Sequence, residues 1–265
     1  MVQSRKKRKD KKKLLGSHQR SWIWGRHAVC EILEAGRWPM SELYLSDQLD
    51  PGEQQDAKIQ ADALGYMVRI ESPDRIHELC KTGEHQGYLA KMLDYPYADL
   101  EEILAKLQTN TKTNPIPIFV MLDGIQDPYN FGAIVRSAEV LGINGFVISD
   151  TNQVGVTSMV ARSSAGAVNH LPIVRTENLL AAIETLKKSG VSVIGASEKG
   201  ATPLDEHNFD SPTLLILGNE GSGICEDLLK QCDTRLSIAQ TGKVGSLNVA
   251  AAAAILFHEA RRPRG

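Results

Sequence analysis

Three loops rich in glycine and asparagine carry the side chains best suited to chemistry in this chain of 265 residues. They read LDGIQDPYNFG, ILGNEGSGI and IAQTGKVGSLN, and each follows an apolar run and precedes a helix-like segment. In a parallel sheet, ligands bind at the edge formed by the carboxyl ends of the strands. We therefore expect the loops to converge there and to offer backbone N–H groups to a ligand with carboxylate, ribose and adenine groups.

The sequence excludes several other kinds of site. It contains neither the G-x-x-x-x-G-K-[ST] loop of nucleoside triphosphatases nor a strand-linked G-x-G-x-x-G. Its four cysteines form no C-x-x-C pair, and its seven histidines form no zinc-binding pair. We expect no metal site and no disulfide framework, and a reducing cytoplasm as the location. No run of 18 apolar residues predicts a membrane span.

The elements that must position the loops are strands that alternate with helices. In the second half of the chain we expect strands at 118–125, 145–150, 191–197, 213–220 and 234–239, and helices at 130–142, 158–168, 179–190, 223–232 and 245–262. The strands are apolar without alternation, which is typical of a parallel sheet covered on both faces. The predicted fold class is therefore α/β.

The first half predicts a smaller α/β domain. A helix is expected at 22–36, ending at Gly36, and strands and helices alternate from there to residue 98. The polar, proline-bearing stretch near 108–115 is the best linker candidate. We therefore divide the chain into a tail at 1–21, a first domain at 22–98, a linker region at 99–115 and a second domain at 116–265.

The amino-terminal tail is strongly basic. Residues 1–20 hold nine Lys or Arg and one Asp, whereas the net charge of the whole chain is −2, so the remainder carries about −10. The tail has no hydrophobic periodicity and no apolar core of a secretory signal, and we expect it to be disordered. It could be an arm that binds RNA or DNA through counterion release, a solvated tail or a localisation signal.

Taken together, the three loops resemble the three motifs of the SpoU or TrmH-like RNA ribose 2'-O-methyltransferases. DPYNFGAIVRSAEVLG (127–142) resembles the first motif, LLILGNEGSGI (214–224) the second, and IAQTGKVGSLNVAAAAAILFHEARR (238–262) the third. MVARSSAGAVNHLPIVR is similar to the family's connecting segment. GRHAVCEIL and HQGYLAKM resemble the front domain of the 23S ribosomal RNA guanosine 2'-O-methyltransferase branch.

This resemblance implies a fold and an activity that periodicity alone does not show. It implies a methyltransferase domain with a deep trefoil knot, a small α/β RNA-binding front domain and a homodimer. It implies S-adenosylmethionine as cofactor and ribosomal RNA as partner, with the ribose 2'-oxygen attacking the sulfonium methyl. The reaction needs positioning of the two reactants and removal of the hydroxyl proton, and no metal.

Five residues match the motif positions to which the resemblance assigns catalysis: Asn130, Arg136, Glu220, Ser246 and Asn248. Arg136 either activates the 2'-hydroxyl or orients the adjacent phosphate, and a guanidinium suits the second role better. Asn130 is either a helix N-cap or a residue that touches the substrate or braces Arg136. Glu220 could pair with Arg136 or with a dimer partner. Ser246 could cap the last helix and also serve the substrate, while Asn248 could serve the knot.

Four residues match the family's adenosine pocket: Leu217, Gly218, Ile238 and Leu247. We expect their backbone to hold the cofactor, and we expect Gly218, Gly221 and Gly223 to allow close backbone approach to it. The alanine run 250–254 is expected to let the last helix pack closely against neighbouring backbone.

The chain departs from the family pattern in two places. Ala239 and Gln240 replace the usual Pro-Met, which changes loop stiffness and the pocket lining. Tyr129 and Phe131 stand where relatives often carry His or Leu, which changes how the target nucleotide is met. Two alternatives to a ribosomal RNA enzyme remain at this point: a transfer RNA ribose 2'-O-methyltransferase, and a non-catalytic RNA-binding factor in ribosome assembly.

Overall fold

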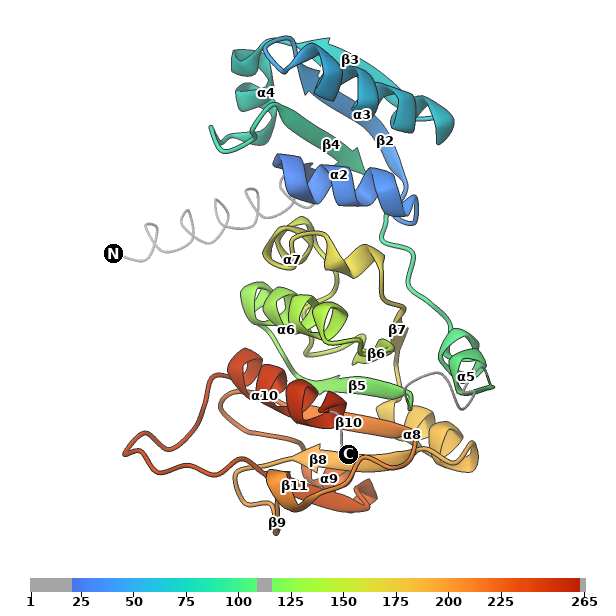
Figure 1. The fold of residues 1–265 in the computed structure, drawn as a ribbon, viewed down its shortest axis with the longest axis vertical. Helices are drawn as coiled ribbons and strands as arrows, with labels where there is room; N and C mark the ends of the chain where they lie inside the picture. The colour runs from blue at the N-terminus through green and yellow to red at the C-terminus, as the bar shows by residue number, and fades with distance from the viewer. Residues whose placement is uncertain (1–20, 109–115, 263–265) are drawn as a thin grey trace, which may run out of the picture. The chain divides into compact units, whose positions relative to one another are not determined.

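A computed structural model of the chain describes residues 21–108 and 116–262. The described chain forms two compact units (Figure 1). Of the described residues, 21–96 and 156–169 form the first unit, and 97–108, 116–155 and 170–262 form the second. The basic tail at 1–20 and residues 109–115 of the proposed linker region lie outside the described residues. The domain boundaries at 98, 99 and 115 stay a prediction.

The first unit is built on a sheet with the strand order β1-β4-β2-β3. Its strands are β1 (Trp22–Trp24), β2 (Met40–Ser46), β3 (Met67–Glu71) and β4 (Tyr88–Met92), and its helices are α2 (Arg26–Ala35), α3 (Pro51–Ala63) and α4 (Pro73–Cys80). The prediction of a helix at 22–36 was wrong at its start, because Trp22–Trp24, aromatic and β-branched residues, pair with β4 as a strand. Gly25, at φ 98°, turns the chain between β1 and α2.

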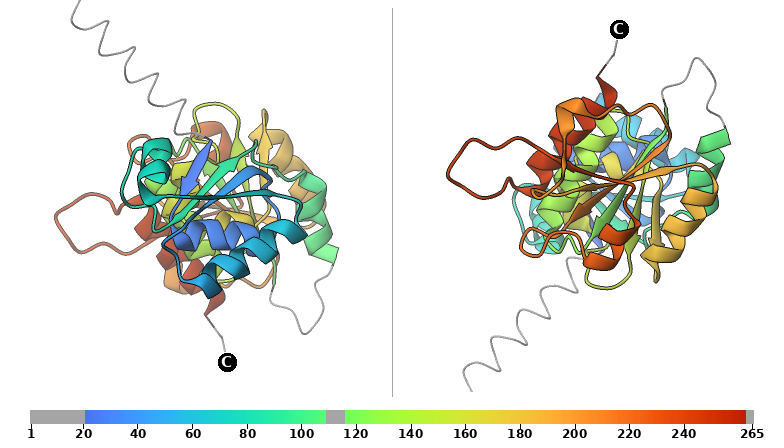
Figure 2. Two further views of the ribbon diagram at one scale, coloured as in Figure 1. Left: turned by 90° about the horizontal axis from the view of Figure 1, so that it is seen from above. Right: turned by 90° about the horizontal axis from the view of Figure 1, so that it is seen from below.

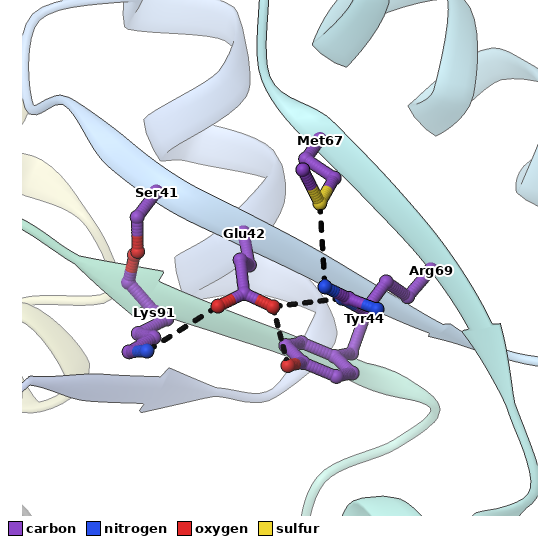
Figure 3. A network of polar contacts seen from close by, with 6 residues as sticks. All are labelled: Ser41, Glu42, Tyr44, Met67, Arg69 and Lys91. Atoms are coloured by element: carbon purple, nitrogen blue, oxygen red, sulfur yellow. Dashed lines mark hydrogen bonds and ion pairs between the residues drawn. The ribbon is translucent and has the colours of Figure 1, made fainter.

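A polar network lies on this sheet around the carboxylate of Glu42 (Figure 3). The carboxylate accepts hydrogen bonds from the Tyr44 hydroxyl at 2.6 Å and the Arg69 Nε at 2.7 Å, and Lys91 Nζ lies 3.3 Å away. The hydrogen bond from Tyr44, reinforced by the two cations, lowers the pKa of Glu42 to about 2. Burial and the contact with Glu42 raise the pKa of Tyr44 to about 12. The network joins three strands of the sheet.

The segment 156–169 belongs to the first unit although it follows β6 in the chain. It contains α7 (Ser158–Ser163) and a short 3-10 helix, η1 (Ala167–Asn169). The single helix expected at 158–168 was wrong, because Ala165 and Gly166 adopt φ values of 51° and 88° and break it. The Arg162 guanidinium lies 4.0 Å from the centroid of a Trp24 ring, a cation–π contact that joins the segment to β1.

The second unit has a seven-stranded sheet with the order β7-β6-β5-β10-β8-β11-β9, and every neighbouring pair is parallel. Its strands are β5 (Ile118–Asp123), β6 (Gly145–Ser149), β7 (Ile173–Thr176), β8 (Ser192–Ala196), β9 (Thr202–Pro203), β10 (Thr213–Gly218) and β11 (Thr234–Ser237). The α/β class and the parallel sheet are confirmed. Strands β7 and β9 were not expected. The trefoil knot stays a prediction.

Helices cover both faces of this sheet (Figure 2). They are α5 (Leu100–Gln108), α6 (Pro128–Val140), α8 (Leu179–Lys188), α9 (Glu226–Gln231) and α10 (Val249–Arg261), with the short 3-10 helix η2 (Leu204–Glu206). Helices α6 and α10 lie side by side on one face, where Phe131 packs edge-on against Phe146 of β6. On the other face, buried residues of the sheet form one cluster with residues of α5, α8 and α9.

Helix α10 is held at its carboxyl end by Arg261. The guanidinium donates to the backbone oxygens of Ile116 and Gly142 and to Asn144 Oδ1, at 2.5 to 2.7 Å. Burial lowers the pKa of Arg261. In the alanine run only Ala253 is fully buried, so this residue allows close packing while the other four remain partly or fully exposed. The arrangement fixes the helix whose first turn reaches the candidate site.

Candidate active site

The loops after β5 and β10 are tied together at the carboxyl edge of the sheet. Asn219 Nδ2 donates to the Gly124 oxygen at 2.7 Å, and Asp123 Oδ2 accepts from the N–H of Cys225 at 2.7 Å. Both side chains therefore bridge neighbouring strands, and the expectation that these loops converge is correct. This bracing fixes the backbone that carries Glu220.

The glycine-rich turn after β10 does not offer the row of free N–H groups that we expected. Asn219 Oδ1 accepts from the N–H groups of Gly221 and Ser222 at 2.8 and 3.2 Å, and Asn219 exchanges two backbone hydrogen bonds with Gly223. With Cys225 bound to Asp123, five of the seven N–H groups at 219–225 have acceptors inside the protein. The turn is closed by its own hydrogen bonds, and most of its donors are not available to a ligand.

Gly218 is required by the chain itself. A Cβ at this position would lie 2.2 Å from the Gly223 carbon and the Ile224 nitrogen, far inside contact distance. Gly223 has a φ of 71°, which glycine adopts without strain. At Gly218 the close approach is thus between two stretches of backbone, while the approach of Gly221 and Gly223 to a cofactor stays a prediction.

Three of the five predicted catalytic residues form one hydrogen-bonded row. Asn248 Nδ2 donates to Asn130 Oδ1 at 3.0 Å, and Asn130 Nδ2 donates to Glu220 Oε1 at 2.6 Å. The row joins the first turns of α6 and α10 to the turn after β10, so residues 118 positions apart meet directly. The amide of Asn130 uses one donor and one acceptor at once, which fixes its orientation. We call Asn248, Asn130 and Glu220 the polar row.

Arg136 does not join the polar row. It lies six residues after Asn130 on α6, about 9 Å along the helix and on another side of it. Its side chain is exposed, and it forms no hydrogen bond or ion pair with any residue in 21–108 or 116–262. Within one chain the suggested contacts of Arg136 with Glu220 and with Asn130 are not formed, and Asn130 contacts Glu220 instead.

Two helix caps also differ from expectation. The N-cap of α6 is Asp127, whose Oδ1 accepts from the N–H of Tyr129, so Asn130 is not a cap. The N-cap of α10 is Asn248, whose Oδ1 accepts from the N–H groups of Ala250 and Ala251 at 2.9 and 3.3 Å. Ser246 is therefore not the cap. Ser246 and Leu247 lie in the loop before Asn248, so the helix starts two residues later than a cap at Ser246 would require.

A cleft of about 460 Å³ opens beside the polar row. All four predicted cofactor residues line it: Leu217, Gly218, Ile238 and Leu247. Glu220 and Ser246 line it as well, whereas Asn130, Arg136 and Asn248 do not. Leu217 is buried and Leu247 is 42% exposed, so the cleft has an apolar floor and an open rim. A volume of this size is typical of small-molecule sites.

The positions that depart from the family pattern fall in different places. Gln240 lines the cleft, and Ala239 does not. Tyr129 is 60% exposed beside Asn130, whereas Phe131 is fully buried and packs against Phe146. Phe131 is therefore a core residue, and the expectation that it meets the target nucleotide was wrong.

One loop of the cleft was missed in the sequence. Ser197, Glu198 and Lys199 follow β8 and line the cleft next to the ends of β10 and β11. The only signal was the position of ASEKG directly after a buried strand, since the segment lacks the asparagine and multiple glycines of the other loops.

Within the described ranges no group of three or more His, Cys, Asp or Glu side chains could hold a metal ion. Among the helices of residues 21–108 and 116–262, none is long and apolar enough to cross a membrane.

The second unit is thus a parallel α/β domain with a cleft at the carboxyl ends of its strands, beside the polar row. Comparison with known proteins identifies the family to which this domain belongs. The model of the SpoU rRNA Methylase family matches residues 117–258, and that of RNA 2'-O ribose methyltransferase substrate binding matches residues 22–98. The chain belongs to the SpoU rRNA methylase family. It is an RNA 2'-O-methyltransferase, and its cofactor is S-adenosylmethionine, the methyl donor of this family.

Individual relatives span nearly the whole chain. The protein named "Putative TrmH family tRNA/rRNA methyltransferase YacO" of Bacillus subtilis is 31% identical over 248 residues, which cover 94% of this chain and 98% of that protein. The Synechocystis protein named "Uncharacterized tRNA/rRNA methyltransferase slr0955" is 34% identical and covers 92% of this chain, which spans 62% of that protein.

Solved structures show the same fold. The SpoU methyltransferase AviRb of Streptomyces viridochromogenes, in complex with the cofactor AdoMet, superposes with a TM-score of 0.74 at 25% identity, covering 91% of this chain and 88% of its own. The AdoMet-bound rRNA methyltransferase of Sinorhizobium meliloti shares the fold with a TM-score of 0.77 at 23% identity, covering 94% of this chain and 90% of its own.

Proposed function

We propose that this chain methylates the 2'-oxygen of a ribose, that of a guanosine, in 23S ribosomal RNA. The observation that carries the proposal is the 460 Å³ cleft that opens beside the polar row Asn248, Asn130 and Glu220. A front domain matched by the substrate-binding model of RNA ribose methyltransferases supports a large RNA substrate. The resemblance of its sequence to the 23S enzymes favours ribosomal RNA and guanosine.

The cleft fits S-adenosylmethionine in size and chemistry. The apolar side chains of Leu217, Ile238 and Leu247 offer surfaces for the adenine ring, and Gly218 lines the cleft beside them. The polar backbone of the loop from Ile238 to Leu247 is able to bind the edge of the ring and the ribose. Bound there, S-adenosylmethionine supplies an electrophilic methyl group on its sulfonium.

The chain's own residues then have to position the ribose and take up its proton. Asn130 is fixed by Asn248 on one side and Glu220 on the other, so it is pre-oriented to touch the incoming nucleotide. Glu220 accepts the Asn130 amide through Oε1, and its exposed carboxylate lines the cleft, where it attracts positive charge. Ser246 lies on the same rim and offers a hydroxyl to the substrate.

Arg136 serves the substrate as a phosphate clamp. Its side chain is exposed and has no partner among the described residues, so its fork of donors is available for two oxygens of an RNA phosphate. A guanidinium carries five N–H donors and no acceptor, which suits a phosphate contact better than the alternative role of a base.

An apolar groove on α10 supports the proposed homodimer. It has a volume of about 540 Å³ and is lined by Leu204, Ile238, Ala239, Ala254 and Ile255, with Asp205, His258 and Glu259 at its polar side. Ile255 is 41% exposed there. A second copy of the chain would cover this surface. We also propose a cytoplasmic location, in keeping with ribosomal RNA as the substrate.

Mapping of 2'-O-methyl groups on ribosomal and transfer RNA, with and without this gene, tests the proposal. Loss of one methyl group from a 23S guanosine is the expected result. Loss from a transfer RNA would favour the second candidate, since the two relatives are both named tRNA/rRNA methyltransferases. An unchanged map, with a defect in ribosome assembly, would instead identify a non-catalytic assembly factor.

A further inference from the structure

The loop after β8 forms a fixed turn at the mouth of the cleft. The N–H of Ser197 donates to the Leu236 oxygen at 2.9 Å, and the N–H of Gly200 donates to the Ser197 oxygen at 2.9 Å. Ser197 Oγ accepts from the N–H of Lys199 at 3.2 Å. A Cβ on Gly200 would lie 2.5 Å from the Leu236 carbonyl carbon, so the turn rests directly on the backbone of β11. Glu198 and Lys199 are thereby presented at the cleft from an anchored backbone.

The charges around the cleft are unequal. Among the described residues that line it, Lys199 is the single cationic side chain, and Glu198 and Glu220 are the two carboxylates. Lys199 is exposed and forms no ion pair with any residue in the described ranges. Its ammonium is therefore free to meet a ligand, and no other side chain of the lining is able to form an ion pair with an anion.

S-adenosylmethionine carries an anion that needs such a partner, namely the α-carboxylate of its methionine part. The glycine-rich turn after β10 would be the obvious receptor, because backbone N–H groups bind carboxylates well. In this chain five of the seven donors at 219–225 are already bound to Asn219, Gly223 or Asp123. Only the N–H groups of Glu220 and Ile224 remain there without an acceptor among the described residues, and neither supplies a positive charge to pair with the carboxylate.

We propose that Lys199 binds the methionine carboxylate of the cofactor and so distinguishes S-adenosylmethionine from adenosine derivatives that lack the amino acid. The inference rests on the proposed seat of the cofactor in the cleft. Lys199 acts in binding and not in the chemical step, so the same contact is made by the product S-adenosylhomocysteine, which keeps the carboxylate.

Isothermal titration calorimetry of the full chain with two probe ligands tests the assignment of Lys199 to the methionine carboxylate. S-adenosylhomocysteine has the amino acid part, and 5'-methylthioadenosine has the same nucleoside without the carboxylate. In Lys199→Ala we expect the Kd for S-adenosylhomocysteine to rise about fivefold, as for a partly solvated charge-assisted contact. The Kd for 5'-methylthioadenosine should stay within about twofold. Lys199→Arg, which keeps the charge, should restore most of the affinity for S-adenosylhomocysteine.

Lys188→Ala is the matched control, because Lys188 is an exposed lysine at the end of α8 that does not line the cleft. It should change neither Kd. Equal weakening of both probes in Lys199→Ala, or no weakening of either, overturns the inference while the cleft remains the cofactor site. A wild-type chain that binds neither probe overturns the proposed cofactor site, and the inference with it.

Discussion

Asn248 combines two tasks, and a pair of substitutions separates them. Its Oδ1 caps α10 by accepting from the N–H groups of Ala250 and Ala251, while its Nδ2 donates to Asn130 in the polar row. Asn248→Ala removes both interactions. Asn248→Asp keeps an oxygen acceptor for the cap and places a negative charge at a helix N-terminus, which is favourable, but it removes the donor to Asn130.

The structure sets the expected magnitudes. Loss of an N-cap costs about 1 kcal/mol of unfolding free energy, so Asn248→Ala should lower the Tm by about 2 to 4 °C. Asn248→Asp should stay within about 0.5 kcal/mol of the wild type. Both substitutions release one side of Asn130, whose amide is otherwise fixed between Asn248 and Glu220. Misplacement of a substrate-positioning group on this scale is expected to lower kcat by about 10- to 100-fold in both variants.

Thermal unfolding and single-turnover methyl transfer to ribosomal RNA measure the two effects side by side. Asn178→Ala is the control, because Asn178 caps α8 through the N–H of Ala181 at 3.0 Å and lies outside the cleft and the polar row. It should lose a similar amount of stability and no activity. Full activity in Asn248→Asp would refute the role of the polar row, and a loss of stability equal to that of Asn248→Ala would refute the assignment of the cap.

Three further substitutions and one truncation test other parts of the account. Gly218→Ala should unfold at a lower temperature in calorimetry or fail to accumulate, because its Cβ would lie 2.2 Å from backbone atoms. A wild-type Tm would contradict the close approach of Gly218 to the backbone of Gly223 and Ile224. Glu42, whose pKa the hydrogen bond from Tyr44 and two cations lower to about 2, stabilises the fold above the ordinary carboxyl pKa of about 4. That contribution disappears as the pH falls from about 4 toward about 2. The free energy of unfolding of Glu42→Gln, measured in urea, should therefore depend less on pH in that range than that of the wild type. An identical dependence would show that the Glu42 network does not contribute to acid destabilisation. Arg136→Ala should abolish methyl transfer while the Kd for S-adenosylhomocysteine changes less than a few-fold, and full activity would exclude Arg136 from the mechanism. Deletion of residues 1–20 should weaken RNA binding and reduce its salt slope, by about 0.7 for each RNA phosphate that the tail neutralises, and an unchanged slope would show that the tail does not bind RNA.

Residue patterns in the sequence were sufficient for five of the seven strands in the sheet of the second unit, all except β7 and β9. The runs that became β5 and β10 are continuously apolar, and a strand buried on both faces needs that composition, so type and position could both be predicted. The Gly36 end of α2 was predictable for a similar reason, because a left-handed residue at a helix end favours glycine. The start of α2 was not, because the pairing of Trp22–Trp24 with β4 depends on a strand more than 60 residues away.

The candidate site was predictable as a place and not as a set of interactions. Motif positions indicated that Asn130, Glu220 and Asn248 belong to one site, and the structure joins them. The choice of partners depends on which turn each side chain faces, and that is set by the helix starts at Asp127 and Asn248. The missing ion pair between Arg136 and Glu220 follows from the helix geometry of α6, because six residues turn the side chain away.

The lining of the cleft shows a different limit of sequence reasoning. Glycines in the turn after β10 suggested free N–H groups, but Asn219 binds several of them, and only the folded turn reveals where its amide oxygen points. The turn at Ser197–Gly200 carried no motif and became part of the cleft only through its packing on β11.

Nucleoside analysis of ribosomal RNA after incubation with the purified full chain and labelled S-adenosylmethionine tests the central claim most directly. The RNA should be isolated from cells without this gene, so that the target is unmodified. We predict that the label appears as 2'-O-methylguanosine in 23S RNA, in about one copy per molecule at most, and that Arg136→Ala abolishes it. Label on a base, or no transfer to ribosomal RNA by a chain that binds S-adenosylhomocysteine, would contradict the proposal.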